Sequence, residues 1–386
     1  MQSYFFAIAN FHVDCFNYMV YIVDIENILI RGLLQMSKES CSQNCGCDTE
    51  EMSTTPVING VQNVSTSLTC CDVLGACKVR WGIGRMDYTV EPGLYAVGKP
   101  NGESPVLVSA NYKLTFDILR KNLSGLDCWL LILDTNGVNV WCAAGKGTFG
   151  TEELISRINA VGLSEIVTHK NLILPQLGAP GVNSNEVKQR TGFAVTFGPI
   201  RAEDIQAFIS SGNKATKEMR LVKFTFKDRL VLTPIEIVPV VKMSLPVFGV
   251  LFLTNQFAKR PFDKHDIAAY AGAVLSGAVL TPLLLPYIPG KAFAWKGFVT
   301  GLCWTVGSLW KSNRFTRDDR FLSAGQLLLL PAISSFLAMN FTGASTYTSP
   351  SGVKKEMKKA LPFIVGAASI GAALTLGVHL FGRRKR

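Results

Sequence analysis

The segment Cys128–Gly147 reads CWLLILDTNGVNVWCAAGKG, and it contains the two features on which the predicted fold depends. Its first part, Cys128–Asp134, is a short unbroken apolar run, which is typical of a strand buried on both faces of a sheet. Its second part, Asn139–Gly147, begins with an N-capping residue and ends in glycines, so a short helix is predicted over residues 139–146. A buried strand that leads through a loop into a helix indicates an α/β sheet.

The same alternation of strands and helices continues on both sides of this segment. Strands are predicted at Gly93–Gly98, Pro105–Ala110, Asn171–Pro175 and Phe193–Phe197, and helices at Tyr112–Leu123, Glu152–Val161, Glu186–Thr191 and Ala202–Ser210. Such alternation predicts a mainly parallel sheet covered by helices. We therefore predict one Rossmann-like or flavodoxin-like α/β domain over residues 78–228, a length typical of a single domain.

The remainder of the chain is too apolar for an ordinary soluble protein. Of its 386 residues, 48% are hydrophobic and only 17% are charged. Five apolar stretches, each about as long as a bilayer core is thick, are Pro234–Phe257, Ile267–Ile288, Phe293–Trp310, Phe321–Phe341 and Ala360–Phe381. The sequence therefore predicts an all-α transmembrane domain over residues 229–386.

The first apolar stretch leaves the topology open, because it contains Glu236, Lys242 and three prolines. Five spans would place the basic loops that follow it on the outer side, against the positive-inside rule. Four spans, with the first stretch re-entrant or lying on the membrane, would satisfy that rule better. Both arrangements remain open at this point.

Residues 1–77 are predicted to be an N-terminal extension, poorly ordered or weakly helical. Residues 1–35 lack the basic start and the cleavage site of a signal peptide. The cysteines of residues 41–77 are Cys41, Cys45, Cys47, Cys70, Cys71 and Cys77. Their spacing fits neither a zinc ribbon nor a ferredoxin, so scattered thiols are favoured over capture of a soft metal.

The candidate site lies in the loops that follow the predicted strands, because ligands of open α/β sheets bind beyond the carboxyl ends of the strands. These loops contain Ser109–Asn111, Asn139–Gly147, Leu174–Gly181 and Gly198–Pro199. Their small residues would let a large flat ligand approach the backbone. Ordinary turn chemistry is the alternative explanation for each loop taken singly.

Several common sites are excluded by the residues themselves. Gly145-Lys146-Gly147 lacks the spacing and the following Ser or Thr of a P-loop, and no dinucleotide fingerprint is present. A cysteine nucleophile needs a histidine base, and His169 is the single histidine of the predicted α/β domain. The net charge of +11 is spread over helix ends and short loops, so a nucleic-acid partner is not expected.

A resemblance gives the site a specific interpretation. The runs NVWCAAGKGTFGT, SPVLVSANYKLTFDILR, LILPQLGAPGV and FGPIRAEDIQAF resemble the mercury-methylating corrinoid protein family. That family is itself similar to the cobalamin domain of the corrinoid iron–sulfur protein of the acetyl-CoA pathway. The likeness runs from roughly Val79 to Arg229 and continues into the membrane part. It implies a base-off, cobalamin-type corrinoid covered by helix 139–146 as a cap, with Cys142 as axial ligand to cobalt.

The resemblance also implies which other residues contact the cofactor. From the cap they are Asn139, Val140, Trp141, Ala143, Ala144, Gly145 and Lys146, and from two loops Asn111, Thr115, Gln176, Gly178, Ala179, Pro180 and Gly181. For Lys146, a solvated charge at a helix end is an equally good interpretation.

By the same resemblance the chain is an enzyme, a corrinoid-dependent mercury methyltransferase that transfers a methyl group from methyl-Co(III) corrinoid to Hg(II). A thiolate ligand donates electron density to the metal, which suits release of the methyl group to a soft acceptor. The implied partners are a ferredoxin-like protein with two 4Fe–4S clusters as electron donor and a methyl-folate or methyl-pterin source. The implied location is the cytoplasmic (inner) membrane of an anaerobe, crossed several times, with the corrinoid domain in the cytoplasm.

Two other functions remain open from the sequence. One is a membrane-anchored corrinoid methyl carrier that serves another acceptor, which would keep the same cap. The other is a flavodoxin-like redox domain on a membrane anchor, which would bind a flavin or nucleotide in place of a corrinoid.

Overall fold

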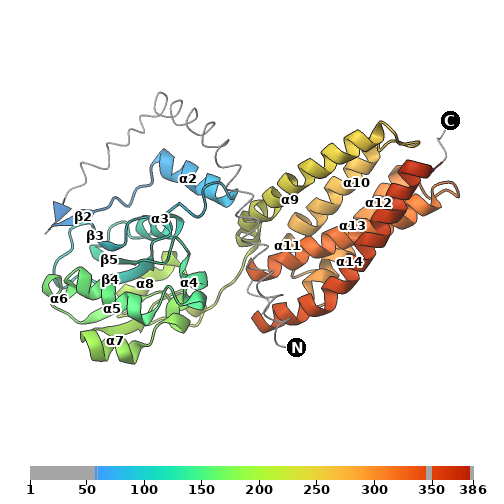
Figure 1. The fold of residues 1–386 in the computed structure, drawn as a ribbon. Helices are drawn as coiled ribbons and strands as arrows, with labels where there is room; N and C mark the ends of the chain where they lie inside the picture. Colours follow the sequence, from blue (N-terminus) through green and yellow to red (C-terminus); the bar gives the residue numbers. More distant parts are fainter. Residues whose placement is uncertain (1–56, 59, 345–349, 383–386) are drawn as a thin grey trace, which may run out of the picture.

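The computed structural model describes residues 57–58, 60–344 and 350–382, which form an α/β domain followed by a helical bundle (Figure 1). The predictions made for residues 1–35 and for Cys41, Cys45 and Cys47 lie outside these residues.

The described strands form one mixed, seven-stranded sheet in the order β1-β2-β3-β5-β4-β6-β7. They are β1 (Val57–Ile58), β2 (Val61–Asn63), β3 (Gly93–Val97), β4 (Val106–Ala110), β5 (Cys128–Leu133), β6 (Asn171–Leu174) and β7 (Ala194–Phe197). β1 pairs antiparallel with β2, and β3 antiparallel with β5, while the other pairings are parallel. The carboxyl ends of β4, β5, β6 and β7 therefore meet at one edge of the sheet.

β5 and β4 lie in the middle of the sheet. Every one of their residues is buried. Helices cover both faces of the sheet. The described helices of this domain are α2 (Cys70–Arg80), α3 (Lys113–Lys121), α4 (Val140–Lys146), α5 (Thr151–Ala160), α6 (Leu163–Ile166), α7 (Ser184–Thr191) and α8 (Ile205–Ser210). α4, α5, α6 and α7 pack on one face of the sheet, and α3 and α8 pack on the other.

α2 begins at Cys70, ahead of the domain boundary predicted at residue 78. Thr69 caps α2 in a capping box with Asp72. The Asp72 carboxylate accepts hydrogen bonds from Lys113 Nζ at 2.5 Å and from Arg120 Nη2 at 2.7 Å, both on α3. Ion pairs, rather than a buried apolar stripe, thus join α2 to α3. Hydrophobic periodicity gives no signal for these pairs.

This ion-pair network makes the stability of the fold depend on pH. Burial by itself raises the pKa of Asp72, but the hydrogen bonds and charge of Lys113 and the bonds from Thr69 outweigh it and hold that pKa well below its usual value of 3.8. A carboxyl whose pKa is depressed in the folded state stabilises the fold above its unfolded-state pKa and loses that contribution as the pH falls. We expect the free energy of unfolding to decrease below about pH 5. In Asp72→Asn part of this decrease should disappear, whereas an unchanged pH slope in thermal unfolding would contradict the assignment.

The helical bundle begins with α9 (Phe226–Asn255) and runs back and forth beside it (Figure 1). The other helices are α10 (Lys264–Leu275), a π-helical segment (Ser276–Leu280), α11 (Thr281–Leu283), α12 (Phe293–Lys311), α13 (Arg320–Asn340) and α14 (Pro350–Phe381). α12 and α13 approach closely at Gly297 and Gly301, where an added Cβ would lie 2.5 Å from atoms of Ser334. Small residues at such a contact are typical of helices that pack in membranes.

By length and composition, four helices of the described chain could cross a membrane: Phe226–Asn255, Lys264–Leu283, Arg320–Asn340 and Ser351–Phe381. The predicted stretch Pro234–Phe257, whose topology the sequence leaves open, belongs to one continuous helix, α9. Three prolines, Pro234, Pro239 and Pro246, lie inside this helix. The predicted stretch Phe293–Trp310 corresponds to α12, which is not among the four. It carries Lys296 near its start and Lys311 at its end.

Candidate functional site

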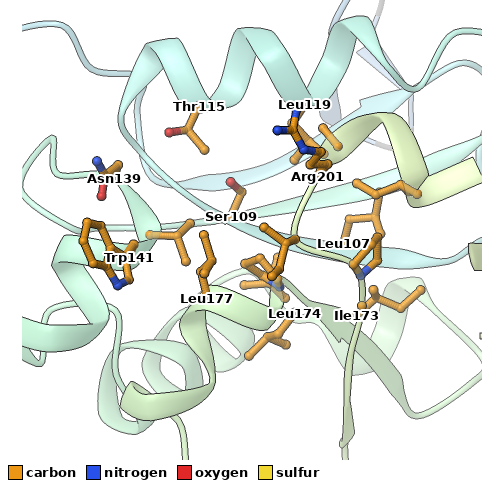
Figure 2. A pocket seen from close by; sticks show the side chains of 18 residues that line it. Leu107, Ser109, Thr115, Leu119, Asn139, Trp141, Ile173, Leu174, Leu177 and Arg201 are labelled. Carbon is orange, nitrogen blue, oxygen red and sulfur yellow. The ribbon is translucent and has the colours of Figure 1, made fainter. Parts of the chain in front are cut away.

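A cavity lies at the edge of the sheet where the parallel strands end, and Figure 2 shows it from close by. Its volume is about 310 Å³, at the lower end of the range for small-molecule sites. The lining residues are Leu107, Val108, Ser109, Thr115, Leu119, Asn139, Val140, Trp141, Ile173, Leu174, Pro175, Leu177, Gly198, Pro199, Ile200, Arg201, Ala202 and Ile205. The wall is therefore mostly apolar, and the loops that the sequence analysis singles out form part of it.

α4 forms one wall of the cavity and is held by both of its ends. Asn139 is the N-cap, and its side-chain oxygen accepts a hydrogen bond from the Cys142 N–H at 2.9 Å. Gly147 ends the helix with a φ of 82°, a left-handed conformation that favours glycine. Val140, Ala143 and Ala144 are buried against the sheet. This leaves Trp141 in the cavity wall, with 45% of its surface exposed.

Cys142 lies one position further round α4, and its thiol is exposed to solvent rather than lining the cavity. Gly145 and Lys146 are also exposed, and a Cβ at Gly145 would meet no atom within 4 Å. The nearby Cys128 differs sharply, because burial, with a smaller effect of Asp127, raises the pKa of its thiol to about 12. Cys128 thus stays protonated in the core, whereas Cys142 is accessible for ligation.

The predicted loop Gln176–Gly181 is the 3-10 helix η2, and it packs directly on α4. A Cβ at Gly178 would lie 2.5 Å from the Phe149 ring, and one at Gly181 would lie 2.1 Å from the Phe149 carbonyl oxygen. The two glycines therefore act through close packing beneath the cap, not through the cavity wall. Gln176 accepts a hydrogen bond from Arg220, and Ala179 and Pro180 do not line the cavity.

Asn111 is buried inside the domain and does not line the cavity. Its side chain is 5% exposed, and its oxygen accepts hydrogen bonds from Thr135 N, Thr135 Oγ1 and Gly137 N at 2.9–3.1 Å. Its amide nitrogen donates to Asp134 at 3.2 Å. Every one of these partners belongs to the loop between β5 and α4. Asn111 therefore fixes the entrance to α4, while Thr115, from the same predicted contact loop, does line the cavity.

Replacing Asn111 by alanine should therefore destabilise the domain, by about 3 kcal/mol, because three donors lose their buried acceptor. The free energy of unfolding, followed by tryptophan fluorescence of the full chain, measures this loss. Asn122→Ala is the matched control, since that amide donates a single hydrogen bond to Ile118 on the surface of α3. Equal losses in the two variants would contradict the role given to Asn111.

Sequence reasoning missed the apolar back wall, formed by Leu107, Leu119, Ile173 and Ile205, because these residues resemble ordinary core positions. It also missed Arg201, the only charged residue among the described residues that line the cavity. Arg201 pairs with Glu203 at 3.1 Å and with Asp228 of α9 at 2.7 Å. The cavity wall is thereby tied to the first turn of the first helix of the bundle.

The donor set at this site fits one kind of metal group. A metal ion held by protein alone needs about three or four ligands, and the part of the chain that the structure describes has no cluster of three or more His, Cys, Asp or Glu side chains that could bind one. A metal carried in a macrocycle needs only an axial donor from the protein. One exposed thiol beside an apolar cavity, with an exposed tryptophan at its edge, suits such a macrocycle.

The α/β domain is similar to known proteins over part of its length. Residues 81–209 match the family model described as CO dehydrogenase/acetyl-CoA synthase delta subunit (CdhD). An acetyl-CoA decarbonylase/synthase complex subunit gamma from Methanopyrus kandleri is 34% identical over 122 residues, 31% of this chain and 26% of the relative. The subunit gamma from Methanocaldococcus jannaschii is 31% identical over 142 residues, 35% of this chain and 28% of the relative. The chain thus spans about a quarter of the length of these curated relatives.

These matches correct the interpretation reached from the short motif. The matching family and the relatives are subunits of acetyl-CoA decarbonylase/synthase and CO dehydrogenase complexes, not mercury-methylating proteins. The predicted membership of the mercury-methylating family is therefore wrong, and so are the predicted mercury methyltransferase activity and the Hg(II) substrate. A corrinoid cofactor and protein partners are consistent with the matches, which do not distinguish the type of corrinoid.

Proposed function

We propose that this chain is a membrane-attached corrinoid protein that carries a methyl group between protein partners. One observation carries the proposal: the cavity at the carboxyl edge of the sheet is flanked by α4 with its exposed thiol, inside the segment that matches the delta-subunit family. The corrinoid iron–sulfur protein that the sequence resembles is the model for this activity. A bound corrinoid would supply a cobalt centre that accepts and releases a methyl group.

Different residues of the chain would make the apolar, axial and polar contacts to a corrinoid. Trp141, Leu177 and Pro199 offer apolar surface to a ring, and Cys142 offers the axial thiolate. Thr115 and Arg201 are among the polar groups of the wall and could bond to side chains of the macrocycle. Because the cavity is smaller than a corrinoid, the ligand would extend past Trp141 into the open space beside Gly145.

Membrane attachment is the second part of the proposal. Four helices could span a bilayer, and the first of them follows directly on the α/β domain. Exposed lysines, Lys354, Lys355 and Lys359, begin α14 at the end of the bundle that faces the α/β domain. The proposal places these lysines and the α/β domain in the cytoplasm, the side that lysines favour. The basic loops 256–263 and 312–319 then lie at the opposite end of the bundle. The proposal also includes two partners, a ferredoxin-like electron donor and a methyl-folate or methyl-pterin source of the methyl group.

Titration of the purified full chain with hydroxocobalamin tests the proposal. Wild type should bind one equivalent and change the absorption spectrum of the corrinoid. Ala202→Trp, which fills the cavity, should weaken binding by at least about tenfold. Ala207→Trp is the matched control, because Ala207 is exposed on α8 and does not line the cavity. Binding of a flavin in place of the corrinoid would favour the redox domain, and equal binding by both variants would remove the cavity from the account.

A further inference from the structure

α2 presents an apolar face to solvent. Val73, Leu74 and Trp81, spaced so that they share one face of the helix, are 52%, 45% and 50% exposed. The opposite face is used inside the domain, where Val79 is buried and Asp72 pairs with α3. A helix whose inner face is already packed, and whose outer face is apolar, is suited to contact something beyond the domain.

The loop after α2 also carries exposed apolar side chains. Ile83 and Met86 are 45% and 55% exposed, and Gly82 and Gly84, both with positive φ, turn the chain between the large side chains. Cations border the face: Lys78, Arg80 and Arg85 are all partly exposed, and Arg85 also lies over the Tyr112 ring at 5.9 Å. We call residues Val73, Leu74, Lys78, Arg80, Trp81, Ile83, Arg85 and Met86 the α2 surface.

The α2 surface lies near the start of α9, and this position indicates which partner it contacts. α2 contacts α9, and in Figure 1 its carboxyl end lies beside the start of that helix. α9 is apolar enough to cross a bilayer, so its first turn would lie at the level of the lipid headgroups. Tryptophan and basic side chains are the residues that favour this layer, because it is apolar on one side and anionic on the other.

We propose that the α2 surface docks on the anionic headgroup layer of the membrane in which α9 is anchored. This inference rests on the membrane attachment in the proposed function but not on the corrinoid. Trp81, Ile83 and Met86 enter the interface, while Lys78, Arg80 and Arg85 pair with lipid phosphates. Together with the ion pair between Arg201 and Asp228, this contact fixes the α/β domain against the bilayer at a second point.

Hydroxyl-radical footprinting of the full chain in nanodiscs tests the proposal. Trp81 and Met86 should be labelled about fivefold less in discs with phosphatidylglycerol than in discs of phosphatidylcholine alone. The double variant Lys78→Glu, Arg80→Glu should restore labelling in the anionic discs, because each basic residue near the surface contributes about fivefold to lipid binding. Lys188→Glu, Arg190→Glu on α7 is the control, and it should leave the protection unchanged.

Three results would overturn the inference. Equal labelling in both kinds of disc would show that the α2 surface faces water. Protection that is independent of lipid charge and is lost when residues 1–35 are deleted would show that this segment of the chain covers it. Protection that appears only when another protein is added would assign the surface to that protein. Assembly into nanodiscs tests membrane attachment separately, so its failure is distinguishable from failure of the docking.

Discussion

Gly181→Ala should destabilise the α/β domain by about 3 kcal/mol, toward the upper end of the usual cost of overpacking. The added Cβ would lie 2.1 Å from the Phe149 carbonyl oxygen and 3.2 Å from the Ala144 Cα. Both neighbours are backbone atoms, so no side chain can turn away to make room. The backbone of η2 has to separate from α4, and the base of the proposed cap opens with it.

Gly145→Ala is the matched control for this change. That position lies on α4 with nothing within 4 Å of an added Cβ, so alanine should stabilise the helix by about 1 kcal/mol. Thermal unfolding of the two purified variants, compared with wild type, measures both effects. Similar melting temperatures for the two variants would contradict the close packing of η2 on α4. If a ligand lies beside α4, Gly145→Ala should also weaken binding of hydroxocobalamin, although it stabilises the protein.

Cys142→Ala should remove the proposed axial ligand from the cofactor site. The variant removes the exposed thiol of α4, so corrinoid bound to it should lose the spectral signature of a sulfur ligand, and affinity should fall by about tenfold. The backbone of α4 should be unaffected, because the Cys142 N–H, and not the Cys142 side chain, donates the capping hydrogen bond to Asn139. X-ray absorption at the cobalt edge reports the ligand directly.

Cys77→Ala is the control for this variant, since Cys77 is also a free, exposed thiol but lies on α2. It should leave the cobalt environment unchanged. A sulfur ligand that persists in Cys142→Ala would mean that another residue binds the metal. The proposal for Cys142 would then be rejected, even if the cavity itself holds the corrinoid.

The parts of the fold that follow from hydrophobic pattern could be predicted from the sequence. The predicted strand Cys128–Asp134 is apolar up to Leu133, and β5, which ends at that residue, is buried throughout. Features that depend on pairing between distant polar groups could not be predicted in the same way. The docking of α2 depends on Asp72, Lys113 and Arg120, which are far apart in the sequence, and the antiparallel pairing of β3 with β5 depends on the chain's path between strands.

The location of the candidate site could also be predicted from the sequence, but the role of each of its residues could not. The loops were recognisable because small residues follow apolar strands, but the role of each residue depends on direction. Asn111 turns inward to hold a loop, and Gly181 packs under α4. Arg201 lines the cavity from within the run FGPIRAEDIQAF, in which the resemblance assigned no contact residue. The motif around Cys142 gave no means of identifying the methyl acceptor, because residues beside a ring do not encode what the ring's ligand reacts with.

The most direct test of the account is a cryo-electron microscopy map of the full chain in nanodiscs after loading with hydroxocobalamin. The account predicts density for the macrocycle against Trp141 and Leu177, at the edge where β4, β5, β6 and β7 end, with the Cys142 thiol at the metal. Density at another place, or a cavity that stays empty while the protein remains folded, would contradict the central claim that this edge of the sheet is a corrinoid site.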